Sequence, residues 1–229
     1  MNPERPSLTA LGRCARSVVW TVFAYWGVIA LICPVMTIDS QMYNLTRVEL
    51  ALRDGFFGSD YFTSVFHIVF PWSFDALHLP FILLGWGYAL PSYLCLVGTS
   101  LVVLTMIRAR LGPDVAWVGV LSLLALPCLV YQATSTKNDI GLLFSIAIWV
   151  YARWRRNSES RDSHLIWMVL AIGFQPGVKT TGLPIAAGLA GWTLWEVRAN
   201  RRLWCQTAAG LGGAVLLFGS IETCLESAR

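Results

Sequence analysis

Three groups of ionisable residues stand at the ends of apolar segments in this sequence. Asp39 follows the first apolar segment, Asp139 begins another, and Lys179 lies between two short ones. Ionisable groups at membrane depth are costly to hold there and usually have a function. Carboxylates and lysines near a lipid interface suit transfer from a lipid phosphate. One carboxylate could act as general base, while a lysine balances the charge that develops on the departing phosphate.

The elements that would position these residues are predicted to be membrane-spanning helices. The 229 residues are 56% hydrophobic and 13% charged, with a mean hydropathy of +0.59, whereas a soluble domain is about 25% charged. About 20 apolar residues cross a hydrocarbon core, and the uncharged stretches are 17–38, 76–107, 115–136, 140–152 and 203–221. We therefore expect one all-α transmembrane domain over residues 1–229, a polytopic helix bundle with about seven transmembrane helices.

The lysines and arginines predict how this bundle is oriented. If the loops between the apolar segments are numbered in order, every second loop lies on the same side of the membrane. One side carries twelve of the 17 lysines and arginines, and the other side carries five. Because lysine and arginine concentrate in cytoplasmic loops, the N-terminus is expected in the cytoplasm and the three ionisable groups outside it. There is no basic stripe with stacking aromatic residues, so no nucleic-acid partner is expected.

The segment 39–76 is predicted to form the first extracytoplasmic loop, with amphipathic juxtamembrane helices. One helical face is apolar and consists of Leu45, Val48, Leu52 and Phe56, while another carries Asp39, Tyr43 and Arg47. A helix of this kind lies on the membrane surface. A second juxtamembrane helix is expected over 73–84, followed by a bend at 85–91 and a span over 92–107.

Two places predict polar groups held at membrane depth. Residues 163–197 must cross twice between basic loops, which leaves two helices of only about 23 Å that meet around Lys179. The fourth span has only 13 uncharged residues after Asp139. Lys137, Asn138 and Asp139 are therefore expected at or slightly below the outer interface.

Several motifs together resemble the GT-C class of glycosyltransferases, which use polyprenyl-phosphate sugars and include protein O-mannosyltransferases and the aminoarabinose transferase of lipid A. The motifs are Asp39-Ser-Gln-Met-Tyr43-Asn-Leu-Thr-Arg47-Val, Pro71-Trp72, Leu77-His78-Leu-Pro80, Gly87-Tyr-Ala-Leu-Pro91-Ser, Arg108-Ala-Arg-Leu-Gly112, Thr134-Ser-Thr-Lys-Asn138-Asp139 and Gly177-Val-Lys179-Thr-Thr-Gly182-Leu-Pro184. The resemblance covers nearly the whole chain. Since members of the class are usually longer, it implies the N-terminal half of such an enzyme, without a soluble C-terminal domain.

The resemblance also assigns roles to individual residues. Asp39 would be the catalytic base or a metal ligand, Asp139 would support it, and Lys179 would face the lipid phosphate. Tyr43, Arg47, His78 and Asn138 would be further substrate-binding residues. The implied partners are a polyprenyl-phosphate-linked sugar, an acceptor glycan, lipid or protein, and membrane lipids, in a bacterial inner (plasma) membrane. The cofactor is not determined: Asp39 and Asp139 could hold a divalent cation, but the metal site is unknown.

Simpler readings of the same residues remain open. Asp39 could cap a surface helix, Asp139 could only start a span, and Lys179 could extend to the interface from a helix end. The rival function is a non-catalytic lipid-binding or transport subunit, since short broken helices also build transport sites. That function would need polar groups inside the bilayer in both halves of a repeat, and the sequence contains neither an internal repeat nor intramembrane charges that face the cytoplasm.

Overall fold

The protein is a bundle of α-helices, as the sequence predicts. The computed structural model describes residues 9–35, 41, 45–46, 48–49, 73–159 and 161–226, and these contain helices and no strand. The helices are α1 (Ala10–Ile32), η3 (Asp75–His78), α4 (Leu79–Leu84), α5 (Leu90–Leu111), α6 (Pro113–Leu124), α7 (Pro127–Ala133), α8 (Asp139–Glu159), α9 (His164–Val178), α10 (Gly182–Val197) and α11 (Arg201–Glu226). The all-α class is therefore confirmed.

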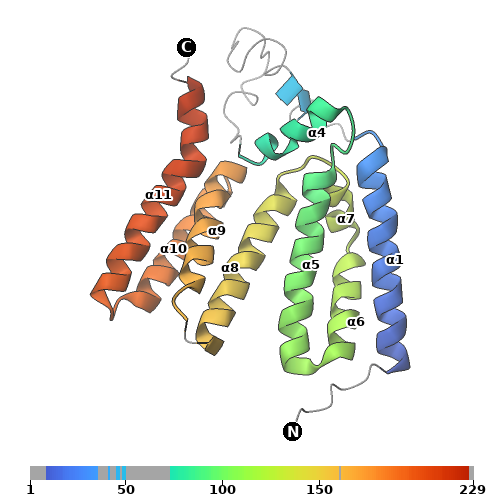
Figure 1. Cartoon of the computed structure of the whole chain (residues 1–229), viewed down its shortest axis with the longest axis horizontal. Helices are drawn as coiled ribbons and strands as arrows, with labels where there is room; N and C mark the ends of the chain where they lie inside the picture. Colours follow the sequence, from blue (N-terminus) through green and yellow to red (C-terminus); the bar gives the residue numbers. More distant parts are fainter. Residues whose placement is uncertain are drawn as a thin grey trace.

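The long helices lie side by side and alternate in direction between two ends of the bundle (Figure 1). Helices α1 and α5 are long and apolar enough to cross a membrane, and α6 with α7 would make a third span if the bent pair counts as one. These helices identify an integral membrane protein. The total of about seven transmembrane helices stays a prediction.

The third predicted span is broken in the structure. Helices α6 and α7 meet at an angle of 74°, although residues 115–136 carry no charge and were expected to form one span. The break falls at Leu126, which has extended backbone angles and precedes Pro127. A proline disfavours helical geometry in the residue before it and cannot donate a backbone hydrogen bond, which explains the bend.

The segment before α5 follows the prediction closely. The 3₁₀-helix η3 and the short α4 occupy the region expected for a juxtamembrane helix, and the chain then turns at Gly85 and Gly87. These glycines have φ of 74° and 73°, a left-handed geometry that glycine adopts without steric cost. The following helix begins at Leu90 and ends at Leu111, so it is longer than the predicted span over 92–107.

Helix α9 is the centre of one half of the bundle, because it packs against α8, α10 and α11. Met168 and Ile172 on α9 belong to the core shared with these helices. Helices α1, α5, α6 and α8 enclose a second core. As predicted, α9 and α10 are short, with 15 and 16 residues.

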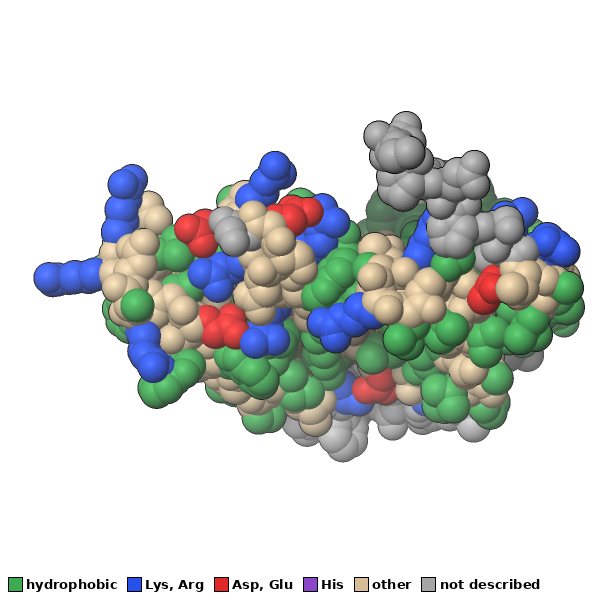
Figure 2. All heavy atoms as spheres, turned by 90° about the horizontal axis from the view of Figure 1, so that it is seen from below, with side chains coloured by type: hydrophobic (Ala, Val, Ile, Leu, Met, Phe, Trp, Pro, Cys, Tyr) green, Lys and Arg blue, Asp and Glu red, His purple; other side chains and the backbone are tan. Residues whose placement is uncertain are grey.

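The two ends of the bundle are named here by their charged residues. The Lys179 end contains the start of α8, the end of α9 and the start of α10. The Glu196 end contains the end of α8, the start of α9 and the junction of α10 with α11. Figure 2, which looks onto this end, shows basic and acidic side chains gathered there. The long helices thus run from one polar end to the other.

Candidate functional site at the Lys179 end

The structure brings together two of the predicted site residues, Asp139 and Lys179. The Lys179 Nζ atom donates a hydrogen bond to Asp139 Oδ1 at 2.5 Å, although the residues are 40 positions apart. Their side chains are 39% and 40% exposed, for Lys179 and Asp139 respectively. Because both charged groups remain accessible, a lysine of this pair can also contact an anion while the carboxylate keeps it in place.

The backbone around Lys179 explains how this side chain is positioned. Helix α9 ends at Val178, and Lys179 adopts an extended conformation while its N–H still donates to Gln175 O. Asn138 is the neighbour of Asp139, and its Nδ2 atom donates to Val178 O at 2.9 Å. Asn138 therefore links the start of α8 to the end of α9, directly beside the ion pair.

Asp139 owes its place to the start of α8. It is the first residue of this helix, where a carboxylate is favoured by the positive end of the helix dipole. The structure is thus compatible with both readings of Asp139, as a helix start and as a site residue. A carboxylate that only starts a helix needs no lysine partner, so the contact with Lys179 from another loop favours the site reading.

A segment before η3 closes this end of the bundle from the side. Ser73 N donates to Gly177 O at 2.9 Å, and Ser73 Oγ donates to Phe218 O at 2.8 Å. A Cβ atom on Gly177 would lie only 2.3 Å from Ser73 Oγ. The end of α9 therefore carries glycine where Ser73, near the end of the predicted first loop, packs against it.

His78 is buried in the structure and lies against the neighbouring helix through Phe74. His78 is 1% exposed, and its ring packs edge-on against the Phe74 ring. Phe74 in turn touches Gly141, two residues after Asp139. Burial lowers the pKa of His78 to about 4, although its hydrogen bond to Phe74 O acts in the opposite direction. His78 is therefore neutral at physiological pH.

Gln175 is a candidate residue that the sequence analysis did not single out. It is fully buried, and within the described part of the chain neither its Oε1 nor its Nε2 atom has a hydrogen-bond partner. Its backbone carbonyl holds Lys179, so it lies directly beneath the ion pair. A buried amide without partners is costly, and such groups often have a functional reason. The only signal in the sequence was a glutamine within an apolar stretch.

The remaining predicted residues, Asp39, Tyr43 and Arg47, lie outside the described residues. Two apolar members of the same segment are described, and both Leu45 and Val48 are buried. Among the described residues, no group of three histidine, cysteine, aspartate or glutamate side chains could hold a metal ion.

These features define an integral membrane protein of the all-α class with a partly exposed ion pair at one end. The profile of the dolichyl-phosphate-mannose-protein mannosyltransferase family matches residues 67–221, more than half of the chain. The chain therefore belongs to this family, which supports a membrane glycosyltransferase of the GT-C type. No curated protein and no solved structure matches the chain.

Proposed function

We propose that this chain is all or the N-terminal part of an enzyme that transfers a sugar from a polyprenyl-phosphate donor to an extracytoplasmic acceptor. The acceptor would be a glycan, a lipid or a protein. The observation that carries this proposal is the contact between Lys179 and Asp139, which presents a lysine beside a carboxylate at one end of a membrane bundle.

The proposed reaction uses Asp39 as general base. The Asp39 carboxylate takes the proton from an acceptor hydroxyl, whose oxygen attacks the anomeric carbon of the sugar. The bond between that carbon and the phosphate oxygen breaks, and polyprenyl phosphate leaves with both bonding electrons. Lys179 balances the charge on the departing phosphate, while Asp139 holds the lysine. Tyr43, Arg47 and Asn138 are proposed to contact the substrates, and His78 would shape the same end.

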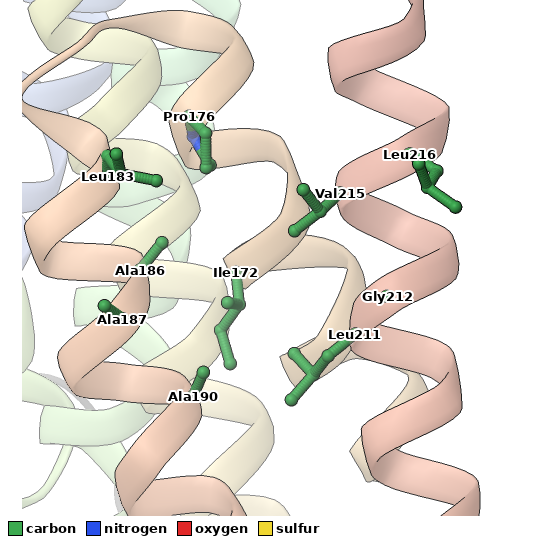
Figure 3. A pocket seen from close by; sticks show the side chains of 10 residues that line it. All are labelled: Ile172, Pro176, Leu183, Ala186, Ala187, Ala190, Leu211, Gly212, Val215 and Leu216. Atoms are coloured by element: carbon green, nitrogen blue, oxygen red, sulfur yellow. The ribbon is translucent and has the colours of Figure 1, made fainter.

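A groove beside this end can accommodate an isoprenoid chain. It has a volume of about 470 Å³ and is almost entirely apolar. Figure 3 shows Pro176 and Leu183 at the end of the groove that leads to the Lys179 loop, and Ala190 and Leu211 toward the other end. A lipid whose hydrocarbon part enters this groove would bring its phosphate near the ion pair.

The arrangement of charges supports a particular orientation in the membrane. The last turn of α5 also lies at the Glu196 end (Figure 1). The exposed arginines at this end include Arg108, Arg110, Arg198, Arg201 and Arg202. Since basic residues concentrate on the cytoplasmic side, we place the N-terminus in the cytoplasm and the Lys179 end outside, in a bacterial inner membrane. Cysteine accessibility to a membrane-impermeant reagent in intact cells would test this orientation.

The role of Asp39 can be tested by substitution in the longest natural form of the protein. Asp39→Asn should abolish sugar release from a polyprenyl-phosphate donor, whereas Glu49→Gln removes a carboxylate from the same segment and should leave transfer intact. Both variants should keep the wild-type melting temperature. Retained turnover of Asp39→Asn would reject the proposed base, and lipid binding without any turnover of the wild type would favour the non-catalytic subunit.

A divalent cation is the one cofactor that the proposal leaves open. Carboxylate oxygens suit such an ion, and the two proposed ligands are Asp39 and Asp139. Asp139 already accepts a hydrogen bond from Lys179, so Asp39 would be the principal ligand. Transfer that is lost with a chelator and restored by added Mg²⁺ or Mn²⁺ would support a bound cation. Transfer that is unchanged by the chelator would assign Asp39 to base catalysis alone.

A further inference from the structure

A pocket with both apolar and polar lining residues lies between α8 and α9 at the Glu196 end, opposite to the proposed sugar-transfer site. It has a volume of about 290 Å³. Its lining residues are Ile148, Tyr151, Ala152 and Arg155 from α8 together with His164 and Trp167 from α9. Nothing in the proposed transfer reaction uses this pocket.

The lining changes from apolar to charged toward the end of the bundle. Ile148, Ala152 and Arg155 are spaced so that they follow one face of α8, with the arginine nearest to the helix end. On α9 the charged end is matched by His164, while Trp167 is 58% exposed and lies beside the apolar part. An apolar wall that ends in an arginine matches the polarity of an anionic phospholipid, whose apolar chains end in a charged headgroup.

Arg155 and His164 both contact one carboxylate, that of Glu159. Glu159 accepts from Arg155, one helical turn earlier, and lies 3.0 Å from His164 Nε2. Arg155 also lies 6.0 Å from the Tyr151 ring centre. Glu159 does not itself line the pocket. It holds Arg155, whose remaining N–H donors can face a ligand.

We propose that this pocket binds the headgroup phosphate of an anionic phospholipid from the leaflet at the Glu196 end. The phosphate would accept from Arg155, with His164 beside it in the lining, and one acyl chain would run along Ile148 and Trp167. Charge complementarity supports this partner, because the same end exposes several further arginines and basic groups at a membrane surface attract anionic lipids. The proposal does not depend on the sugar-transfer reaction.

The test is a titration of the purified protein with phosphatidylglycerol in detergent. Arg155→Gln should weaken binding about fivefold, since one basic residue near the surface contributes on the order of 1 kcal/mol. Arg110→Gln removes an exposed arginine from the same end and should change binding by less than about twofold. Trp167→Ala, which removes an exposed ring, should also weaken binding. An unchanged affinity in both Arg155→Gln and Trp167→Ala would overturn the proposal.

A second pair of variants separates the pocket from the general charge of this end. Glu159→Gln removes the carboxylate that competes for the same N–H donors, so phosphatidylglycerol should bind more tightly. Asp162→Asn makes the same change of charge nearby, outside the pocket, and should have a smaller effect. Equal effects of the two variants, or equally tight binding of phosphatidylcholine or of water-soluble glycerol 3-phosphate, would contradict a site for an anionic lipid.

Discussion

The two ends of the bundle both join α8 to a neighbouring segment through an acid and a base, but they do so differently. At the Glu196 end, Glu196 is mostly buried, with 16% of its side chain exposed. Its Oε1 atom accepts from Arg153 Nε at 2.7 Å and from Trp192 Nε1 at 2.9 Å. Asp139 and Lys179 instead form a single contact with about two fifths of each side chain exposed.

This difference separates a structural contact from a candidate binding contact. Arg153 is further held by the Trp192 ring, whose centre lies 4.8 Å from the guanidinium carbon, and Trp149 Nε1 donates to Thr193 Oγ1. This network fixes α8 against α10, and its donors are already engaged by Glu196 and Thr193. Lys179 has three ammonium donors, so its contact with Asp139 leaves donors for a phosphate.

The largest effect that this difference predicts is that of a substitution at Asp139. Asp139→Asn should lower the rate of sugar transfer by about 100-fold, because it removes the carboxylate that we propose to hold the lysine and support the base. The melting temperature should hardly change, since exposed ion pairs contribute about 0–1 kcal/mol. A transfer assay and a thermal melt of the same preparation measure both. A large loss of stability with normal transfer would make the pair structural.

At the Glu196 end the expected effect is on stability instead. Glu196→Gln should lower the free energy of unfolding by about 2 kcal/mol, because hydrogen bonds to charged groups lose strength when the charge is removed. The rate of transfer per folded molecule should not change. Denaturant unfolding in detergent measures the loss, with Asp162→Asn, an exposed acid at the same end, as a control that should be near wild type.

A glycine substitution tests how the Lys179 end is held together. Gly177→Ala places a methyl group against Ser73 and should cost about 1–2 kcal/mol through overpacking. Gly191→Ala in the middle of α10 meets open space and should cause no loss, because alanine is the better helix former. If Gly177→Ala melts like the wild type, the contact between Ser73 and α9 is not tightly packed.

The smallest expected effect is a dependence on pH that comes from His78. Its folded-state pKa is about 4, below the ordinary 6.5, so the unfolded chain takes up a proton first as the pH falls. The neutral, buried His78 therefore contributes its full share to the free energy of unfolding above about pH 6.5, and this contribution is lost as the pH falls toward 4. The free energy of unfolding should be lower by roughly 1 kcal/mol at pH 5.5. A His78→Gln variant should lose less stability over this range. Parallel pH curves for both proteins would show that His78 does not titrate in this way.

The positions of the charged residues and the lengths of the apolar stretches between them predicted much of the fold. The short helices α9 and α10 followed from the distance between two basic loops, and α8 begins at Asp139 because the apolar stretch begins there. The bend at Leu126 was not predicted, although Pro127 was visible, because the uncharged stretch 115–136 has the length of a single membrane span and gave no reason to divide it.

The sites were harder to predict than the helices. The grouping of Asp139 with Lys179 was expected, but the contribution of Gln175 depends on its burial at the end of α9, which periodicity does not reveal. The contact of Glu196 with Arg153 spans 43 positions and depends on the register of α8 against α10. Such registers arise from side-chain packing across helices rather than from any local pattern.

The most direct measurement of the central claim is the affinity of the purified protein for a polyprenyl phosphate without a sugar. Lys179→Met should weaken this binding at least about tenfold, because it removes a charge-assisted hydrogen bond to the phosphate. Arg153→Met removes a cation from the Glu196 end and should leave the affinity of the folded protein unchanged. Equal affinities of the wild type and Lys179→Met would show that the phosphate does not bind at the Lys179 end.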